Sequence, residues 1–377
     1  MSDTTVMGTA LSFADAPPER VLVIVTRRIG DVLLATPMLR SLKRAWPHAE
    51  IDVLVFAGTE GFVAGNRDVH RVLTVPERPR FREHLGLASR LVRRYDLALS
   101  LLPGDRPTLY AWLAGKRRAG LLEPTAKARW KRRLLDAWIA FDDRDTHTVR
   151  MYLALLHAVG VAATAEVSAA WTEADSTLAA ELLAPLHGAL YAVMHPYPKF
   201  EYKKWTTEGW IAVAQWLIAR GFKVVLTAGP AADECAYVGE IARRIPDALN
   251  LSGKLTLGAT ARVVSRAAVY VGPDTAITHA AAALGVPTVA LYGPTNPVKW
   301  GPWPPGQSPD ENPWLRVGSQ AVRDVRLVQG SGPCVPCAQE GCERHIASSS
   351  DCLTGLPAAR VIAAIEDVLQ LQRQRSQ

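Results

Sequence analysis

The sequence has no apolar run of the ~18 residues that a membrane-spanning helix requires. Its first twenty residues are small, polar and acidic, whereas a secretory signal peptide is basic and then apolar. We therefore expect a cytoplasmic protein in which residues 1–20 form a flexible N-terminal tail.

Three glycine-containing motifs are also absent. The first predicted strand is not followed by G-x-G-x-x-G, and neither G-x-x-x-x-G-K-[ST] nor G-x-S-x-G occurs in the chain. These motifs bind dinucleotides, bind nucleoside triphosphates and carry a nucleophilic serine, respectively. The sequence therefore lacks the motifs by which a dehydrogenase, a P-loop enzyme or an α/β-hydrolase would be recognised.

Apolar segments alternate with segments of helical periodicity along the 377 residues, of which 49% are hydrophobic. An apolar run at 22–25 is followed by a helical pattern and then by a strand pattern at 51–56, which is a βαβ unit. A second such series starts with a strand at 189–194. The pattern predicts an α/β fold with two doubly wound, Rossmann-like domains, which we expect to face a central cleft. We place them at residues 21–175 and 185–356, with a C-terminal helix at 357–377.

Positive charge is concentrated in one stretch of a chain whose net charge is +7. Residues 106–133 contain nine basic side chains and one acidic residue, Glu123. Such a stretch is typical of a solvated helix face, or of a surface for an anionic partner such as a phosphorylated glycolipid, an acidic membrane or a nucleic acid. Residues 127–138 also contain Trp130 and Trp138, as interfacial helices often do, although a helix packed on its own domain would show the same pattern.

The segment most suggestive of a ligand site is Gly272-Pro273-Asp274-Thr275-Ala276-Ile277-Thr278-His279. It follows an apolar run at 267–271 and opens an alanine-rich helix that ends near Gly285. A strand, a turn and a helix start present free N–H groups and a positive dipole end, which favour a nucleotide diphosphate. Asp31 lies at the corresponding junction after the first strand, where it could cap the helix or act as a general base.

Four motifs together are similar to the lipopolysaccharide heptosyltransferases of glycosyltransferase family 9. They are R-I-G-D-V-L-L-A-T-P at 28–37, K-K-W at 203–205, D-T-A-I-T-H at 274–279 and Y-G-P-T-N-P at 292–297. Each motif alone is weak, but they occur in order within a resemblance that covers residues 20–365. The resemblance implies a GT-B fold, with the acceptor on the first domain and a nucleotide sugar, usually ADP-heptose, on the second.

The same resemblance implies inverting transfer of heptose from ADP-heptose to a lipopolysaccharide core acceptor, without a metal or other cofactor. Asp31 then corresponds to the catalytic base and Lys203 to the lysine that contacts the diphosphate, although Lys199 and Lys204 are close enough in sequence to replace it. The nucleotide-sugar-binding residues implied are Asp274, Thr275, Ala276 and His279, with Asp233 or Glu234 for the ribose. Both acids would equally suit the first turn of a helix. Many relatives carry glycine in place of Ala276, and the Cβ of alanine would narrow the approach of the backbone to a diphosphate.

On the acceptor side, we expect the basic stretch to bind an anionic glycolipid through Arg117, Arg118, Arg129 and Arg132. The protein would then lie peripherally on the cytoplasmic face of the inner membrane. Alternatives are the same fold with another nucleotide sugar or glycan acceptor, or a nucleotide-sugar-binding protein without turnover. A mere binder would not need both Asp31 and Lys203. A nucleic-acid partner is not expected, because no recognition motif accompanies the charge.

Four of the five cysteines lie close together in the sequence. Cys334, Cys337, Cys342 and Cys352 have the spacing C-x2-C-x4-C-x9-C. In a cytosolic chain this spacing suggests a structural zinc site, reduced thiols that pack a loop, or redox use. Comparable C-x-P-C segments occur in similar heptosyltransferases.

Overall fold

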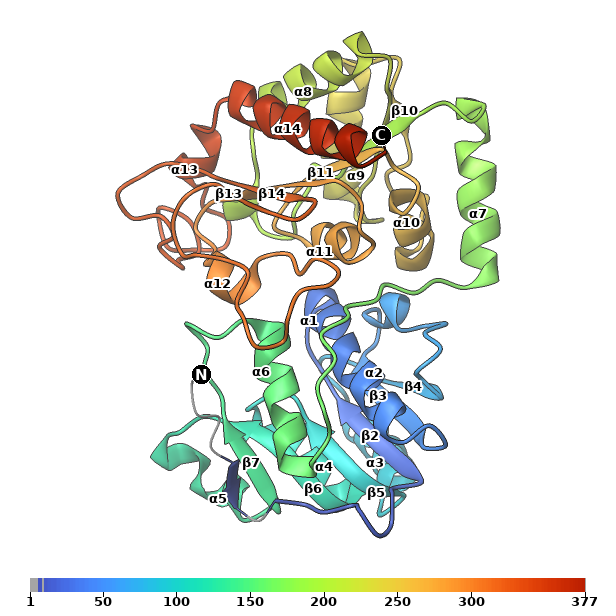
Figure 1. The fold of residues 1–377 in the computed structure, drawn as a ribbon, viewed down its shortest axis with the longest axis vertical. Coiled ribbons are helices and arrows are strands. Elements are labelled where there is room, and N and C mark those ends of the chain that lie inside the picture. Colours follow the sequence, from blue (N-terminus) through green and yellow to red (C-terminus); the bar gives the residue numbers. More distant parts are fainter. Residues whose placement is uncertain (1–5, 9, 377) are drawn as a thin grey trace. The chain divides into compact units, whose positions relative to one another are not determined.

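The computed structural model describes residues 6–8 and 10–376, which form two compact α/β units (Figure 1). The first unit contains residues 1–170 and 306–312, and the second contains residues 171–305 and 313–377. Each unit is built around one seven-stranded sheet. None of the helices in the described residues has the length and apolar character needed to span a bilayer.

The sheet of the first unit has the strand order β1-β7-β6-β5-β2-β3-β4. Six of its strands are parallel, and β1 pairs antiparallel with β7 at one edge. Its strands are β1 (Val6–Gly8), β2 (Arg20–Ile24), β3 (Glu50–Phe56), β4 (Arg71–Val75), β5 (Tyr95–Ser100), β6 (Gly115–Leu122) and β7 (Ala137–Ala140). The central strands β2 and β5 are buried almost throughout, as expected for parallel strands covered on both faces.

Helices cover both faces of this sheet, because the chain leaves β2 first toward β3 and later toward β6. The helices are α1 (Ile29–Leu34), α2 (Thr36–Ala45), α3 (Phe81–Leu91), α4 (Asp105–Ala114), α5 (Arg129–Arg132) and α6 (Thr148–Ala154). Three short 3₁₀ segments are η1 (Glu60–Phe62), η2 (Ala126–Ala128) and η3 (Leu155–Val159). Helix α4 packs on β2, β5 and β6 and is itself covered by α3, whereas α2 packs on β3.

The sheet of the second unit has the order β10-β9-β8-β11-β12-β14-β13 and is parallel except for the edge strand β13. Its strands are β8 (Tyr191–Met194), β9 (Lys223–Leu226), β10 (Leu249–Asn250), β11 (Val269–Pro273), β12 (Thr288–Tyr292), β13 (Gln320–Val322) and β14 (Val325–Gln329). The inner strands β8, β11 and β12 are fully buried.

The C-terminal helix α14 (Ala358–Ser376) packs on β12, β14 and α8, and so completes the core of the second unit. Figure 1 shows it lying across the strands. The other helices are α7 (Glu173–Leu183), α8 (Thr207–Ala219), α9 (Ala232–Arg243), α10 (Leu257–Val264), α11 (Ala276–Ala283), α12 (Pro297–Trp300) and α13 (Asp351–Thr354). The 3₁₀ segments are η4 (Ala184–Leu186) and η5 (Glu201–Lys203).

Two expectations from the sequence need correction. The predicted tail at 1–20 is not uniformly irregular, because residues 6–8 form β1, which covers the open edge of β7. Residues 1–5 and 9 of that tail lie outside the described residues. The predicted amphipathic helix at 127–138 is also wrong: only Arg129–Arg132 are α-helical, and Trp138 is a buried residue of β7.

Candidate functional site

In the second unit, the direction of chain progression across the sheet reverses between β8 and β11. From β8 the chain continues to β9 and β10 on one side, and then returns to form β11 on the other side of β8. Ligands of open α/β sheets bind beside the carboxyl ends of the two strands that flank such a reversal. The loop after β8 carries Lys203, and the turn after β11 carries Asp274 and Thr275.

The turn after β11 is tightly packed. A Cβ at Gly272 would overlap the hydroxyl of Tyr270, so this position requires glycine. The hydroxyl of Thr275 caps α11 by accepting from the N–H of Thr278 at 3.4 Å. The N–H groups of Ala276 and Ile277 have no acceptor within the helix, because they belong to its first turn. They supply an anion-binding helix end.

Beside this helix end, the buried carboxylate of Asp274 contacts two basic side chains, Lys203 and His279. The Lys203 Nζ lies 2.5 Å from Asp274 Oδ2, and His279 Nε2 lies 3.7 Å from Asp274 Oδ1. Burial opposes ionisation of Asp274, but Lys203 and His279 keep its pKa well below the usual range. Tyr292 donates to the same carboxylate at 3.4 Å. The buried Nδ1 of His279 has no hydrogen-bond partner among the described residues, and so can accept or donate one bond to a ligand.

The structure distinguishes the three neighbouring lysines. Lys204 lies 2.6 Å from Glu201 Oε2 and stacks against Tyr197, with its Nζ 4.4 Å from the ring centre. Lys199 is exposed. Lys203 is the lysine that the structure brings to Asp274, as the sequence favoured.

The two acidic residues at the start of α9 differ in their surroundings. Asp233 is exposed and accepts a 2.6 Å hydrogen bond from the Tyr197 hydroxyl, which lowers the Asp233 pKa. Glu234 Oε2 accepts from the N–H of Gly229 at 2.7 Å, and burial raises the Glu234 pKa. Glu234 thus lies folded against the turn after β9, at the same carboxyl edge of the sheet.

A buried histidine at this edge was not singled out by the sequence analysis. His195 directly follows β8, and its Nδ1 lies 3.0 Å from the Thr227 hydroxyl at the end of β9. Burial lowers the His195 pKa to about 4, so the ring is neutral at pH 7. The signal that could have found it is its place directly after a strand next to the chain reversal.

In the first unit, the corresponding reversal lies between β2 and β5. Asp31 is the third residue of α1, just beyond the carboxyl end of β2, and is 4% exposed. Tyr152 of α6 donates to Asp31 Oδ1 at 3.4 Å, and Arg27 Nε lies 3.6 Å from the same oxygen. Burial and the adjacent Asp31 raise the Tyr152 pKa, so this hydroxyl stays protonated and donates. The carboxylate is thereby oriented by two partners.

Two of the expected acceptor-binding arginines, Arg117 and Arg118, lie near the start of β6, whereas Asp31 follows the carboxyl end of β2. Arg117 and Arg118 pair in register with Leu97 and Ala98 of β5, near the amino ends of the parallel strands. The structure therefore does not bring them next to Asp31, which follows the carboxyl end.

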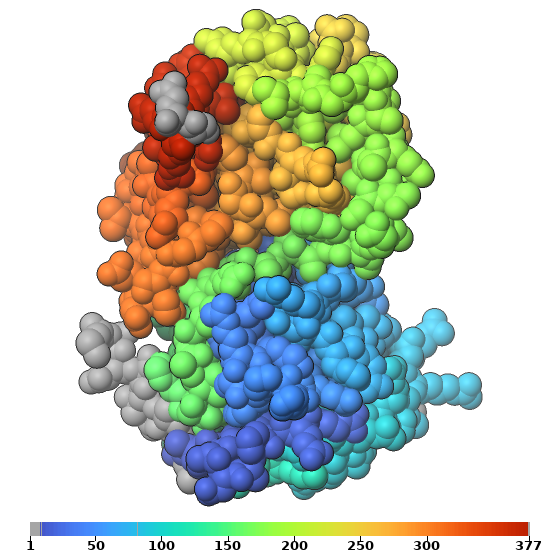
Figure 2. All heavy atoms as spheres, turned by 45° about the vertical axis from the view of Figure 1, so that its right-hand side comes forward, coloured from blue at the N-terminus to red at the C-terminus, as the bar shows by residue number. Residues whose placement is uncertain are grey.

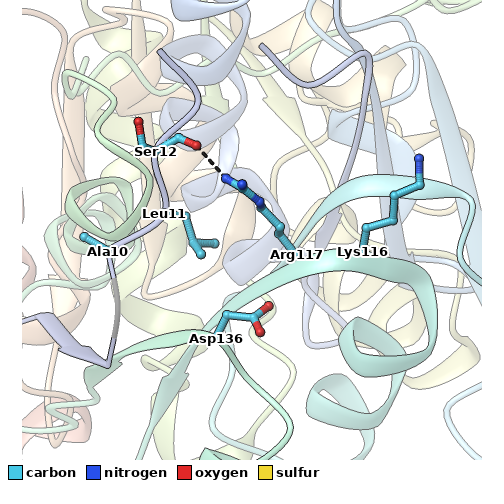
Figure 3. Close-up of a pocket in the computed structure, with 6 residues that line it drawn as sticks. All are labelled: Ala10, Leu11, Ser12, Lys116, Arg117 and Asp136. Carbon is cyan, nitrogen blue, oxygen red and sulfur yellow. Dashed lines mark hydrogen bonds between the residues drawn. The ribbon is translucent and has the colours of Figure 1, made fainter. Parts of the chain in front are cut away.

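These arginines already have partners. Arg118 makes a bidentate ion pair with Asp136 at 3.1 Å for each bond. Arg117 donates to the carbonyl oxygen of Ser12 at 2.5 Å, as the dashed line in Figure 3 shows. Figure 3 also shows Lys116 pointing away from Ser12. A hollow of about 310 Å³ at the amino edge of the sheet is lined by Ala10, Leu11, Ser12, Lys116, Arg117 and Asp136.

The other two arginines belong to the short helix α5. The Arg132 guanidinium stacks on Trp138, 4.6 Å from the ring centre, and Arg129 is exposed. Lys131 of the same helix is buried and bonds to the Pro103 carbonyl oxygen at 2.6 Å. Part of this basic segment therefore packs against the start of α4, where Lys131 contacts Pro103 and Asp105.

The cysteine segment does not form the possible zinc site. Within residues 6–8 and 10–376, no group of three or more His, Cys, Asp and Glu side chains could hold a metal ion. All four cysteines are free thiols. Burial, together with the neighbouring cysteines, raises the Cys352 pKa to about 11, so this thiol is protonated at neutral pH.

The same segment instead supports the loops of the candidate site. The Ser350 hydroxyl donates to the Tyr202 carbonyl oxygen at 2.7 Å, next to Lys203. The N–H of Ala338 donates to the Pro294 carbonyl oxygen at 2.8 Å, in the loop after β12. A Cβ at Gly293 would meet Leu353 at 2.6 Å, so this loop also packs closely on α13. This role is related to the loop packing considered above for these cysteines, but the contacts come from Ser350, Ala338 and Leu353.

Sequence similarity to known proteins shows the family to which this chain belongs. Residues 85–309 match the model of glycosyltransferase family 9 (heptosyltransferase). Lipopolysaccharide heptosyltransferase 1 of Pseudomonas aeruginosa is 30% identical over 343 residues, which cover 86% of this chain and 87% of that protein. Lipopolysaccharide heptosyltransferase 3 of Escherichia coli is 28% identical over 293 residues, which cover 73% of this chain and 83% of that protein.

Solved structures agree at the level of the fold. A family 9 glycosyltransferase from Veillonella parvula superimposes with a TM-score of 0.75 at 20% identity, and covers 96% of this chain and 99% of its own. The E. coli ADP-heptose lipopolysaccharide heptosyltransferase II gives a TM-score of 0.72 at 20% identity, with 94% and 99% covered. The predicted GT-B fold with two Rossmann-like domains is confirmed. The chain belongs to glycosyltransferase family 9 and is a glycosyltransferase enzyme.

Proposed function

We propose that this enzyme transfers heptose from ADP-heptose to a lipopolysaccharide core acceptor, with inversion and without a metal ion. The second domain would bind the donor and the first domain the acceptor. The enzyme would work on the cytoplasmic side of the inner membrane. The observation that carries the proposal is the anion-binding end of α11 beside the Lys203–Asp274–His279 cluster.

In the proposed donor site, the diphosphate lies at the start of α11. The N–H groups of Ala276 and Ile277 and the ammonium group of Lys203 would receive the charge that develops on departing ADP. His279 Nδ1, which has no partner among the described residues, would make a further bond to the donor. Asp233 or Glu234, at the adjacent carboxyl edge, would bind the ribose hydroxyls. The lipopolysaccharide heptosyltransferase relatives support heptose as the transferred sugar, and the E. coli ADP-heptose lipopolysaccharide heptosyltransferase II, which shares the fold, supports ADP-heptose as the donor.

In the proposed acceptor site, Asp31 is the general base. The acceptor hydroxyl oxygen attacks the anomeric carbon, its proton passes to the Asp31 carboxylate, and the bond from that carbon to the diphosphate oxygen breaks. Tyr152 and Arg27 support this role, because their contacts with Oδ1 orient the carboxylate. A positioned base of this kind contributes roughly 10²- to 10⁴-fold to the rate.

A panel of substrates tests the proposal. Purified enzyme is incubated with ADP-, UDP- and GDP-sugars and with core oligosaccharides from which the lipid has been removed, and products are identified by mass spectrometry. We expect transfer from ADP-heptose with inverted anomeric configuration. Efficient transfer from another nucleotide sugar, or the absence of any transfer with retained nucleotide binding, would contradict the proposal.

The base is tested separately by Asp31→Asn. We expect kcat to fall by roughly 10²- to 10⁴-fold, while calorimetric affinity for ADP stays unchanged, because Asp31 lies outside the donor domain. Asp15→Asn, which alters an exposed carboxylate of the same domain, serves as the matched control. Near-normal kcat in Asp31→Asn would remove the base assignment without affecting the donor site.

A further inference from the structure

Large apolar side chains are exposed together on two neighbouring helices of the first domain. Leu85 of α3 is 54% exposed, Val92 at its end 49%, and Leu109 and Trp112 of α4 are each 42% exposed. These are four of the nine exposed large hydrophobic side chains among the described residues. Their concentration on one helix pair points to a surface that meets an apolar partner.

Helix geometry places Leu109 and Trp112 on one side of α4, because they are three residues apart. Leu85 is exposed on α3, and the exposed Val92 directly follows that helix. The opposite sides are buried: Leu87 and Leu91 of α3 belong to the core.

The two helices are also joined to each other. His84 Nδ1 lies 3.4 Å from the Tyr110 hydroxyl near one end of the pair. The N–H of Arg93 donates to the Leu113 carbonyl oxygen at 3.0 Å near the other end. Their outward sides therefore form one continuous surface. Figure 2 shows the light blue atoms of this part of the chain standing out from the surface of the first domain.

The charge of this surface is positive. Arg82, Arg90 and Arg94 are exposed, and none of them forms an ion pair within the part of the chain that the structure describes. The acidic residues of the two helices already have partners. Glu83 accepts from the N–H of Arg80 at 2.5 Å, and Asp105 lies 3.0 Å from Lys131 Nζ.

We propose that this α3–α4 face docks on the surface of an anionic lipid bilayer. The face consists of Arg82, Leu85, Arg90, Val92, Arg94, Leu109 and Trp112. Tryptophan and leucine favour the boundary between head groups and acyl chains, while unpaired arginines are attracted to anionic head groups. The inference rests on the proposed function and deepens it, because it names the surface that would hold the enzyme at the membrane of a lipid-linked acceptor.

Vesicle sedimentation tests this proposal. The full-length protein is mixed with vesicles of phosphatidylcholine alone, or with phosphatidylglycerol added, at low and high salt. We expect binding to the anionic vesicles that weakens with salt. In Arg82→Glu/Arg90→Glu/Arg94→Glu we expect the partition coefficient to fall on the order of 100-fold. In Leu109→Ser/Trp112→Ser we expect a fall of at least about tenfold at both salt concentrations.

Exposed side chains of the second domain provide the matched control. Leu315→Ser/Arg373→Glu removes one exposed apolar side chain and reverses one exposed charge, and should leave vesicle binding unchanged. Loss of binding in this control, equal binding to both kinds of vesicle, or full binding by the α3–α4 variants would overturn the proposal. Binding lost instead in Lys127→Glu/Arg129→Glu/Trp130→Ser would assign the membrane surface to α5 and would also overturn it.

A second readout separates this proposal from the proposed function. Transfer to a core oligosaccharide without lipid needs no membrane, so every α3–α4 variant should retain wild-type turnover on that acceptor. Vesicle binding without turnover would contradict the proposed function alone. Turnover without vesicle binding would contradict the docking face alone. Capture of a second protein by the face, with no vesicle binding, would likewise contradict it.

Discussion

The ammonium group of Lys203 lies 2.5 Å from Oδ2 of Asp274, and both side chains lie beside the first turn of α11. Lys203 comes from the loop after β8 and Asp274 from the turn after β11, so the pair connects the two strands that flank the chain reversal. Although Asp274 is buried, its pKa is held low, so the carboxylate stays ionised beside the Lys203 ammonium group. Asp274 thus positions the Lys203 ammonium group beside the start of α11, where an anionic ligand would bind.

Replacement of Lys203 should affect chemistry more than binding. In Lys203→Ala we expect kcat to fall by roughly 10²- to 10³-fold, because charge on a departing diphosphate loses a fixed cation. Steady-state kinetics with ADP-heptose measure this effect. Lys204→Ala is the matched control, since Lys204 pairs with Glu201 and should change kcat by less than about threefold.

Loss of a buried partner also affects folding, which must be measured separately. Lys203→Ala leaves Asp274 without its nearest cation, so thermal unfolding should show a lower midpoint. Lys203→Arg keeps the charge and is expected to restore most of the stability, but not all of the activity, because the guanidinium has a different shape. Equal activity of Lys203→Ala and Lys204→Ala would refute the role of Lys203.

Stability should decrease with acid because of His195. Its pKa is lowered to about 4 in the native state, while an unfolded histidine has a pKa of about 6.5. Between these values the unfolded chain binds a proton that the native chain does not, so the free energy of unfolding falls as the pH falls from about 6.5 to about 4. Denaturant unfolding at several pH values measures this slope.

His195→Gln removes the titrating ring and should flatten that part of the profile. His70→Gln, which alters an exposed histidine of the first domain, should leave the slope unchanged. An identical acid slope in wild type and His195→Gln would show that other groups cause the loss.

Ala276 should limit how closely a diphosphate approaches α11. It is the first residue of that helix, and its Cβ lies beside the free N–H groups. Ala276→Gly is expected to bind ADP more tightly, at a cost of up to about 1 kcal/mol in stability from the greater backbone freedom of glycine. Calorimetry with ADP and thermal unfolding measure the two effects. Weaker ADP binding in the variant would indicate that the alanine methyl group contacts the donor favourably.

The cysteine segment should be independent of metal. We expect dialysis against a chelator to leave the unfolding midpoint and turnover unchanged, because no metal-binding cluster occurs among the described residues. Cys334→Ser/Cys342→Ser, at two exposed positions, should likewise retain activity. Bound zinc or iron in metal analysis, together with a chelator-induced drop in the midpoint, would contradict this expectation.

Buried strands were the part of the fold most readily predicted from sequence. The expected strands at 51–56 and 189–194 largely coincide with β3 and β8, because short apolar runs suit the interior of a parallel sheet. Residues 127–138 were mispredicted for a tertiary reason. Trp138 is paired in β7 and covered by Arg132, so its apolar surface is used by the sheet and not by a helix.

Site residues were predictable where a motif marked the end of a strand. Asp31 and the 274–279 turn follow β2 and β11, and the topology then brings Lys203 to Asp274. The place of His195 directly after a strand could have marked it, but its low pKa could not be predicted, because that comes from burial that distant elements create. The support that Ser350 gives to the Lys203 loop depends on a contact across 148 positions of sequence, which no local pattern encodes.

The division of the chain into units has a consequence for dissecting the enzyme. Residues 306–312 group with the first domain, although they are encoded after most of the second, and the Arg150 guanidinium donates to the Pro309 carbonyl oxygen at 3.0 Å. A fragment truncated at residue 170 would therefore lack part of its own surface. During synthesis, the first domain likewise stays incomplete until the ribosome has translated well into the second.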